Sequence, residues 1–216
     1  MNWRKFDDLL RTSSHYFSRP DKFEDPFEGR LSPGYKTSES KSWKAFKAAY
    51  GINFEEQQGN ESREIMRRVV FISCWHRARN ENRRMWEAYT KGNSESVVVV
   101  TSAKALSTFL PESIVKSGLK YHENDFPRTM FSHTAIFFYK PVEYCFEREY
   151  RLLLAPGETE SIGAEEYGRH VRVNLKTVLH RVITHPRATN SFKQRVDELM
   201  SHYLKSLRRE DSSLLP

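Results

Sequence analysis

The chain has 216 residues, a length that favours one domain with a substantial core and no need for disulfide staples. Apolar residues make up 38% and charged residues 29%, and the longest aliphatic run, Val97 to Val100, is far too short to cross a bilayer, which argues against a membrane protein. The net charge of +7 favours a polyanionic partner such as nucleic acid or a nucleotide, although solvated basic helix faces explain it equally well.

The N-terminus and the cysteines bear on the compartment. The opening residues MNWRKFDDLL mix acids and bases, unlike a signal peptide, so a cytoplasmic location is predicted. Cys74 and Cys145 each lie in an apolar, strand-like segment, and we predict two reduced core thiols. Neither has a C-x-x-C partner and the histidines lack ligand spacing, so no metal is predicted.

In chain order, the hydrophobic pattern first predicts a helix over residues 4–14 and a short strand over 15–18. A structured loop is expected over 19–29, where two prolines and a glycine oppose a helix. Further helices are predicted at 38–50, 61–68, 81–90, 103–110, 131–147 (breaking near Pro141) and 190–207. Further strands are predicted at 69–75, 95–102, 117–125, 148–155, 170–175 and 180–186.

This arrangement predicts an α+β fold. The strands are irregularly spaced, and the helices gather early and at the end, which favours a mixed, mostly antiparallel central sheet with flanking helices and a C-terminal helix. Residues 1–210 are expected to form a single domain, and 211–216 a disordered tail. No G-x-G-x-x-G or G-x-x-x-x-G-K-[ST] loop occurs, which excludes the Rossmann and P-loop classes.

The first candidate site is SRPDKFEDPFEG, residues 18–29. Its acids surround an aromatic loop and are able to bind a cation or position a substrate; they are Asp21, Glu24, Asp25 and Glu28. The favoured alternative is that Asp25 starts a turn and caps backbone N–H groups. Ser18, at the end of the predicted short strand, is a candidate substrate-binding residue together with Arg19.

The second candidate site is SCWHRARNENRRMWEAY, residues 73–89. Trp75 and His76 leave a strand, and Trp86 and Tyr89 lie three residues apart on the next helix, so all four are candidates for one cavity around a planar ligand. The alternative is that His76 is a hydrogen-bonded structural residue and that the two helical aromatics belong to the core.

The third candidate site is FEREYRLLL, residues 146–154. Alternation in a strand places Glu147, Glu149 and Arg151 on one face, where such charges are costly unless they are paired or used. The alternative is a structural ion pair of Arg151 with one of the two glutamates.

With these residues in view, the chain resembles a bacterial family known as domain of unknown function 2971. The resemblance covers about residues 5–185 and rests on blocks that occur in the family's order: HYFSRPDKFEDPFEG, CWHRARNENRRMWEAY, SVVVVTS, LKY and FEREYR. The family's first strand, W-R-Y-M, usually lies some ten residues before the first helix, whereas Trp3 and Arg4 are too close to the helix predicted at 4–14 to be in that register.

The order of these blocks is also similar to the ADP-ribosyltransferase layout. That similarity implies that Glu149 stabilises the positive charge that develops on the ribose of NAD, that Glu147 orients the acceptor and that Ser18 supports the glutamate. It also implies that aromatic residues wall the nicotinamide, for which the candidates are Trp75, Trp86 and Tyr89. We include His76 as a further catalytic candidate and Arg151 as a substrate-binding one.

Three functions therefore remain open. The first is an NAD-dependent transferase or glycohydrolase, such as a toxin or phage-defence effector. The second is a non-enzymatic nucleic-acid-binding module that uses the basic clusters at 63–84. The third and weakest is a hydrolase with Cys74 or His76 as nucleophile or base, because a mid-strand thiol is usually inert.

Overall fold

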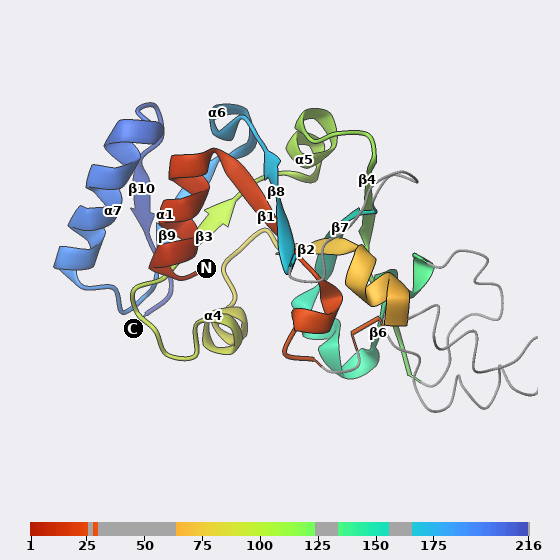
Figure 1. Cartoon of the computed structure of the whole chain (residues 1–216). Helices are drawn as coiled ribbons and strands as arrows, with labels where there is room; N and C mark the ends of the chain where they lie inside the picture. The colour runs from red at the N-terminus through yellow and green to blue at the C-terminus, as the bar shows by residue number, and fades with distance from the viewer. Residues whose placement is uncertain (26–27, 30–63, 124–133, 156–165, 216) are drawn as a thin grey trace, which may run out of the picture. The chain divides into compact units, whose positions relative to one another are not determined.

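Figure 1 shows the computed structural model of the chain, which describes residues 1–25, 28–29, 64–123, 134–155 and 166–215. Its separate helices and mostly antiparallel five-stranded sheet confirm the predicted α+β class. The helix predicted at 38–50 lies outside the described residues.

The backbone contacts of the chain cluster into two compact units, whereas the sequence favoured a single domain. Unit 1 comprises Met1–Tyr16, Ala78–Glu112 and His170–Pro216, and unit 2 comprises Phe17–Arg77 and Ser113–Arg169. Each unit is therefore assembled from segments that are distant in the sequence.

Unit 2 is built on three antiparallel strands: β2 (Phe71–His76), β4 (Ile114–Gly118) and, between them, β7 (Glu149–Leu154). The strands β1 (Ser14–Ser18) and β8 (Gly168–Arg172) complete the order β4-β7-β2-β1-β8, and each spans a boundary between the units along the chain. The first half of β2, which contains Phe71 and Ile72, is buried as its apolar sequence predicts, whereas Cys74 is exposed and Trp75 and His76 are half-buried.

The register between β2 and β7 decides which side chains share a face. Directly opposed residues of an antiparallel ladder project to the same side of the sheet. Three such pairs lie in a row on one face: Ile72 with Leu153, Cys74 with Arg151, and His76 with Glu149. This face therefore changes from apolar to charged along the strands.

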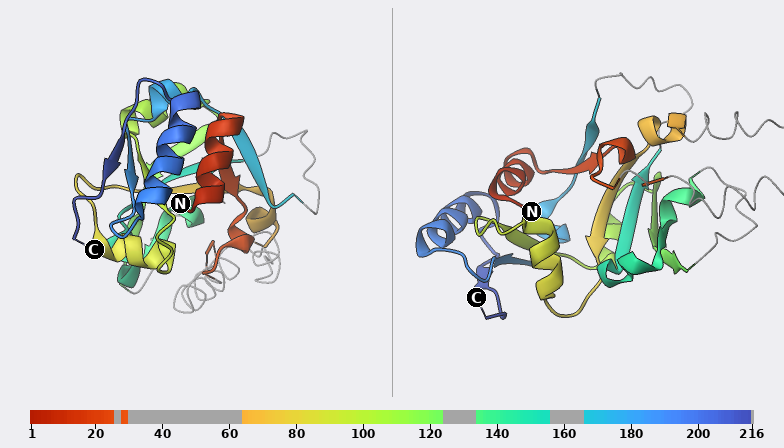
Figure 2. Two further views of the ribbon diagram at one scale, coloured as in Figure 1. Left: turned by 90° about the vertical axis from the view of Figure 1, so that its left-hand side faces the viewer. Right: turned by 90° about the horizontal axis from the view of Figure 1, so that it is seen from below.

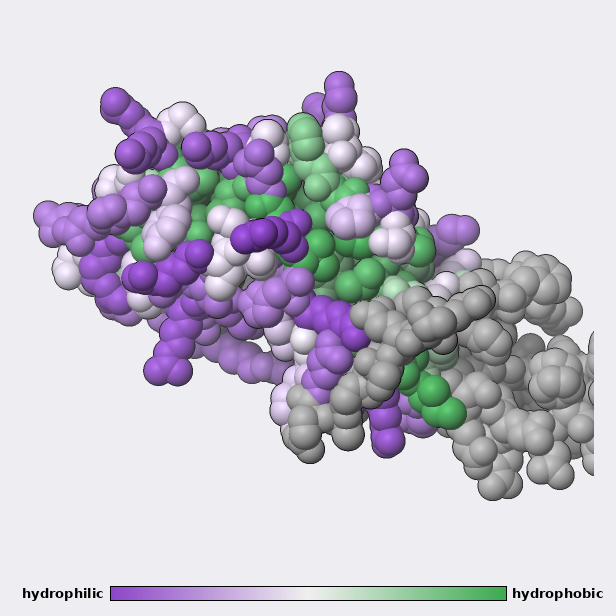
Figure 3. Space-filling model, turned by 45° about the horizontal axis from the view of Figure 1, so that its top comes forward, coloured by the Kyte–Doolittle hydropathy of each residue, from purple (hydrophilic) through white to green (hydrophobic). Residues whose placement is uncertain are grey.

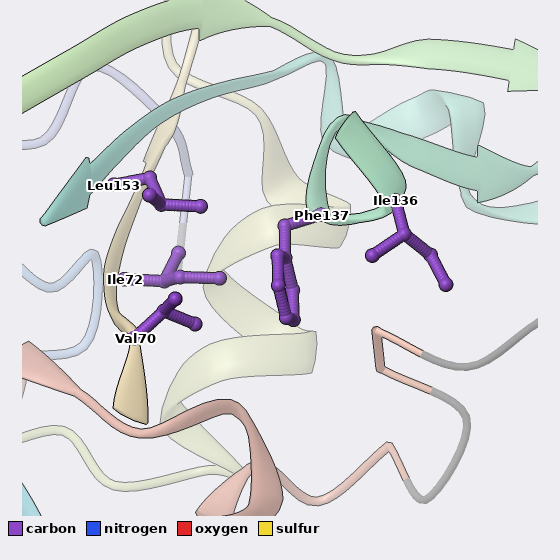
Figure 4. Packing of buried hydrophobic residues seen from close by; sticks show 5 residues of the cluster. All are labelled: Val70, Ile72, Ile136, Phe137 and Leu153. Atoms are coloured by element: carbon purple, nitrogen blue, oxygen red, sulfur yellow. The ribbon is translucent and has the colours of Figure 1, made fainter. Parts of the chain in front are cut away.

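The apolar end of this face is the core of unit 2. Figure 4 shows the ring of Phe137 directed toward Ile72 and Val70, and these residues form one buried cluster with Ile136 and Leu153. Gly29 lies against the same ring. An added Cβ at Gly29 would come within 2.2 Å of Phe137, and its φ is +67°, so the backbone beside Glu28 requires glycine.

Unit 1 contains a three-stranded sheet of order β10-β9-β3, formed by Arg209–Asp211, Arg181–Thr184 and Val97–Val100. Its helices are α1 (Trp3–Thr12), α4 (Arg83–Thr90), α5 (Ala103–Phe109), α6 (Leu175–Val178) and α7 (Asn190–Tyr203). The helices α1 and α7 lie side by side (Figure 2). Their buried faces are apolar, as the predicted periodicity requires.

The helix predicted at 131–147 is absent from the described part of that range. Instead, two 3-10 helices, η2 (Ala135–Phe138) and η3 (Val142–Glu147), flank the short strand β6 (Tyr139–Pro141). Pro141 cannot continue a helix, and aromatic residues favour the extended backbone before it. β6 pairs in parallel with β5 (Lys120–His122), so the strand predicted at 117–125 also divides into two, β4 and β5.

The C-terminal segment differs from the disordered tail expected after residue 210. Asp211 belongs to β10, and the Glu81 carboxylate accepts hydrogen bonds from the hydroxyls of Ser212 and Ser213 at 2.7 and 2.9 Å. The polar residues of the segment favour disorder. However, the carboxylate of the half-buried Glu81 accepts hydrogen bonds from the segment and fixes its position. No described helix has the length and apolarity needed to span a bilayer.

One histidine makes the stability of unit 1 depend on pH. Burial, together with the positive charge of His170, lowers the pKa of His15 from 6.5 to about 4. Between these values the unfolded chain binds a proton that the folded chain does not, so stability rises with pH. We expect denaturant unfolding to show a loss of up to about 2 kcal/mol between pH 7 and pH 5 that His15→Gln removes and His202→Gln, at an exposed position, retains.

Candidate functional site

The charged end of the β2–β7 face holds a buried network centred on Glu149. The ammonium of Lys140 donates to Glu147 and to Glu149, each at 2.6 Å. The second oxygen of Glu149 accepts from Arg151 Nε at 2.6 Å. Both oxygens of the Glu149 carboxylate are therefore engaged by cations.

Arg151 extends the network to a second segment of the chain. Its two terminal nitrogens donate to the two carboxylate oxygens of Glu28, at 2.5 and 2.8 Å, and one of them also donates to the carbonyl of Phe137 at 2.7 Å. The backbone carbonyl of Glu28 in turn accepts from Arg67 Nε at 2.7 Å. Arg151 is fully buried, so its guanidinium cannot reach bulk water, and this forked geometry satisfies its hydrogen-bond donors within the protein.

A local break in the backbone brings Glu147 and Glu149 onto one ammonium. Glu147 ends η3, Glu149 starts β7, and Arg148 between them has φ 42° and ψ 48°, the left-handed conformation. This conformation is uncommon for a side chain such as arginine. It turns both glutamates inward while Arg148 itself remains exposed.

The charges of the network do not balance. Three buried carboxylates, those of Glu28, Glu147 and Glu149, face the two cations Lys140 and Arg151. Burial and the hydrogen bond with Glu149 raise the pKa of Glu147. Burial alone would also raise the pKa of Glu149, but the charge of Arg151 and the hydrogen bonds of its neighbours outweigh burial and lower it. As pH falls, Glu147 therefore takes up a proton before Glu149 does.

His76 and Tyr121 border the network. The carbonyl of Glu147 accepts from His76 Nδ1 at 2.6 Å, which assigns the proton of the neutral ring to Nδ1. Nε2 of His76 is buried, and no described residue bonds to it. The Tyr121 hydroxyl accepts from the backbone N–H of Glu149 at 2.8 Å, and burial raises the pKa of that hydroxyl.

The structure shows how the residues of the E-x-E-x-R motif are paired. Glu149 and Arg151 share a face as predicted, and they form the ion pair that was the alternative to a functional role. Glu147 lies in a 3-10 helix rather than in the strand, and it pairs with Lys140. Whether these residues also bind a substrate remains a prediction.

The two residues proposed from the first block have local partners. Arg19 is buried and forks onto Asp21 at 2.9 and 2.6 Å, and it also donates to the carbonyl of Glu166. Ser18 lies opposite Ile72 and donates to the carbonyl of Arg19 at 3.4 Å. The guanidinium of Arg19 is therefore already satisfied within unit 2.

The residues predicted to line one aromatic cavity are divided between the two units. Trp75 is half-buried in unit 2, opposite Tyr150. Trp86 is buried in unit 1. Its ring packs edge-to-face with that of His185, with the two ring centroids 5.1 Å apart, and its Nε1 donates to Glu81 at 3.1 Å. Tyr89 is also in unit 1 but is 56% exposed, so the two aromatics of α4 have different environments.

The cysteines are free, as predicted, but both are exposed rather than buried in the core. Cys74 is the cross-strand neighbour of Arg151. Although part of this residue reaches the surface, desolvation by the surrounding protein raises the pKa of the Cys74 thiol, which disfavours a thiolate nucleophile.

Comparison with known proteins identifies no relative. No protein-family model matches the chain, and no curated protein or solved structure is detectably similar to it. The resemblance to domain of unknown function 2971 and to ADP-ribosyltransferases therefore remains a prediction. Within the described residues, no group of three or more His, Cys, Asp or Glu side chains is arranged to hold a metal ion.

Sequence reasoning missed two members of the network. The pattern at 131–147 predicts a helix around Lys140, although a single lysine in the aromatic run IFFYKPVEY indicates that its charge needs a buried partner. Tyr121 is expected only as part of a strand. Glu28 is expected as a loop acid, and no signal in the sequence links it to Arg151.

The opposite pKa shifts predict different effects of two similar substitutions. Glu147→Gln resembles the protonated acid and retains an acceptor for Lys140, so we expect a loss of stability below about 1 kcal/mol. Glu149→Gln removes a buried charge that compensates two cations, and we expect a loss of about 3–5 kcal/mol. Denaturant unfolding measures both, with Glu143→Gln on the exposed side of η3 as the control. Equal losses for the two variants would contradict the different roles of the two carboxylates in the network.

Proposed function

We propose that the protein binds nucleic acid through the basic surface of unit 1. The observation that carries this proposal is the division of charge between the units. Counted over the sequence, unit 1 has 17 Lys and Arg against 10 Asp and Glu, whereas unit 2 has 18 of each. The whole net charge of +7 therefore belongs to unit 1.

Ion pairs neutralise about half of the acids of unit 1 and leave cations at its surface. The pairs are Arg11–Asp7, Arg181–Glu210, Arg195–Glu95, Arg209–Asp197 and Lys193–Asp211. Hydrophilic side chains cover the surface around α1 and α7 in Figure 3. Exposed cations without an acidic partner among the described residues are Arg4, Lys5, Arg79, Lys104, Arg172, Lys176, Arg187, Lys205 and Arg208.

A nucleic acid is the polyanion that such a surface fits best. Its phosphates are regularly spaced, and each one that meets Lys or Arg releases condensed counterions. The free energy of binding then grows with the number of contacts and does not require a deep pocket. Scattered exposed cations on one unit meet this requirement.

Binding should depend strongly on salt. With four phosphate contacts, affinity for a labelled oligonucleotide should fall about 100-fold between about 50 and 200 mM salt, as measured by fluorescence anisotropy. Acetylation monitored by mass spectrometry should show bound oligonucleotide protecting lysines of unit 1, such as Lys104, Lys176 or Lys205, but not Lys22 or Lys120 of unit 2. Affinity that does not change with salt, or protection confined to unit 2, would reject the proposal.

A second candidate function, NAD-dependent transfer or glycohydrolysis of the toxin or phage-defence kind, is favoured by the pair Glu147–Glu149. Two neighbouring carboxyl groups whose pKa values are driven apart are suited to separate acid and charge-stabilising roles. Breaking the bond between nicotinamide and ribose builds positive charge that an ionised Glu149 can stabilise. For Glu149 to contact the ribose, Lys140 or Arg151 would have to release one oxygen of the Glu149 carboxylate.

This second candidate predicts nicotinamide release from NAD by the purified protein. Turnover should be lost in Glu147→Gln, which retains the fold but has no proton to exchange, and should persist in Glu143→Gln. Chromatography of the products measures both. Absence of turnover, together with no change in melting temperature on adding NAD, would eliminate this second candidate function.

A further inference from the structure

The C-terminal end of α7 contains a hollow of about 340 Å³ within unit 1. Met200 and Leu204, each 2% exposed, lie at its apolar side together with Leu207. The rest of the lining consists of Asp197 and Ser201 of α7 and the basic residues Lys205, Arg208 and Arg209. Most ligand-binding cavities start at about this volume, so the hollow can hold a phosphate group and its sugar.

The hollow keeps an excess of two positive charges. Of its three cations, Arg209 is neutralised by Asp197, at 3.1 Å, and by Asp211. Lys205 and Arg208 also line the hollow and are exposed, and neither has an acidic partner among the described residues. An anion that enters therefore meets two uncompensated cations.

The backbone after α7 forms a tight turn next to which these two cations lie. The N–H of Leu204 donates to the carbonyl of Met200 at 2.7 Å and closes the last turn of the helix. The N–H of Leu207 then donates to the carbonyl of Leu204 at 2.8 Å and closes a tight turn. Lys205 and Arg208 lie on and just beyond this turn, so the hollow is lined by a fixed backbone.

We propose that this hollow binds a backbone phosphate of the nucleic acid and is a specific contact of the basic surface. The inference rests on the proposed nucleic-acid binding and deepens it. The guanidinium of Arg208 suits forked hydrogen bonds to phosphate oxygens, and Lys205 supplies a flexible point charge. Charge complementarity identifies a phosphate, and the small volume excludes a run of stacked bases.

Two double variants with the same change in charge test the inference. Lys205→Ala/Arg208→Ala removes the two cations of the hollow, and Lys104→Ala/Lys176→Ala removes two exposed cations elsewhere in unit 1. We expect the hollow variant to bind an oligonucleotide at least about tenfold more weakly, with a salt slope reduced by about 1, and the Lys104→Ala/Lys176→Ala variant, which removes two other cations of the basic surface, to bind no more than about threefold more weakly. All four positions are exposed, so unfolding should change by less than about 0.5 kcal/mol in either variant.

The possible failures are distinguishable. Equal losses in the two variants would overturn the hollow as a specific contact and leave nucleic-acid binding intact. Absence of oligonucleotide binding by the wild type would reject the proposed function itself. In that case, titration with inorganic pyrophosphate, followed by NMR, tests whether the hollow binds a small phosphate compound instead of nucleic acid. Chemical-shift changes at Lys205 and Arg208 would show that it does.

Discussion

The carboxylate of Glu149 and the two cations that share it hold the parts of unit 2 together. Lys140 comes from β6 and Arg151 from β7, and through them the network reaches η3 and the backbone around Glu28. Burial of these charges costs several kcal/mol each, and only mutual pairing offsets that cost. The strands β6 and β7, the helix η3 and the backbone around Glu28 are therefore constrained to one arrangement, because any displacement would leave a buried charge without its partner.

The same network explains why the electrostatic field of the chain comes from unit 1. In unit 2 the acids and bases are equal in number, and its strongest charges face one another inside the protein. In unit 1 the ion pairs leave the cations in excess at the surface. Charges at the surface attract distant ligands, whereas buried pairs act only over a few ångströms. The two candidate functions thus belong to different units and use charge in different ways.

The sequence predicted those features that depend on local pattern. The apolar run of β2 and the spaced apolar residues of α7 are strong periodic signals, and both elements form as expected. The alternation that placed Glu149 and Arg151 together is also local. The network was only partly predictable, because its other members are joined by tertiary contacts: Glu28 lies 123 residues from Arg151 in the sequence, and no spacing rule links them. The backbone of Arg148 was unpredictable for another reason. Its left-handed conformation is usually signalled in a sequence by glycine, and this position is an arginine.

The occupied state of Glu149 also sets a condition for any enzyme built on this site. Its carboxylate is already arranged and charged, which is the preorganisation that stabilises a cationic transition state. However, the partners that keep it ionised also fill its two oxygens. A substrate must therefore replace a buried salt bridge, and the binding energy for this exchange has to come from contacts elsewhere on the ligand. Nucleic-acid binding by unit 1 has no such requirement, because its cations are exposed and solvated before the ligand arrives, and this difference is the physical reason to prefer it.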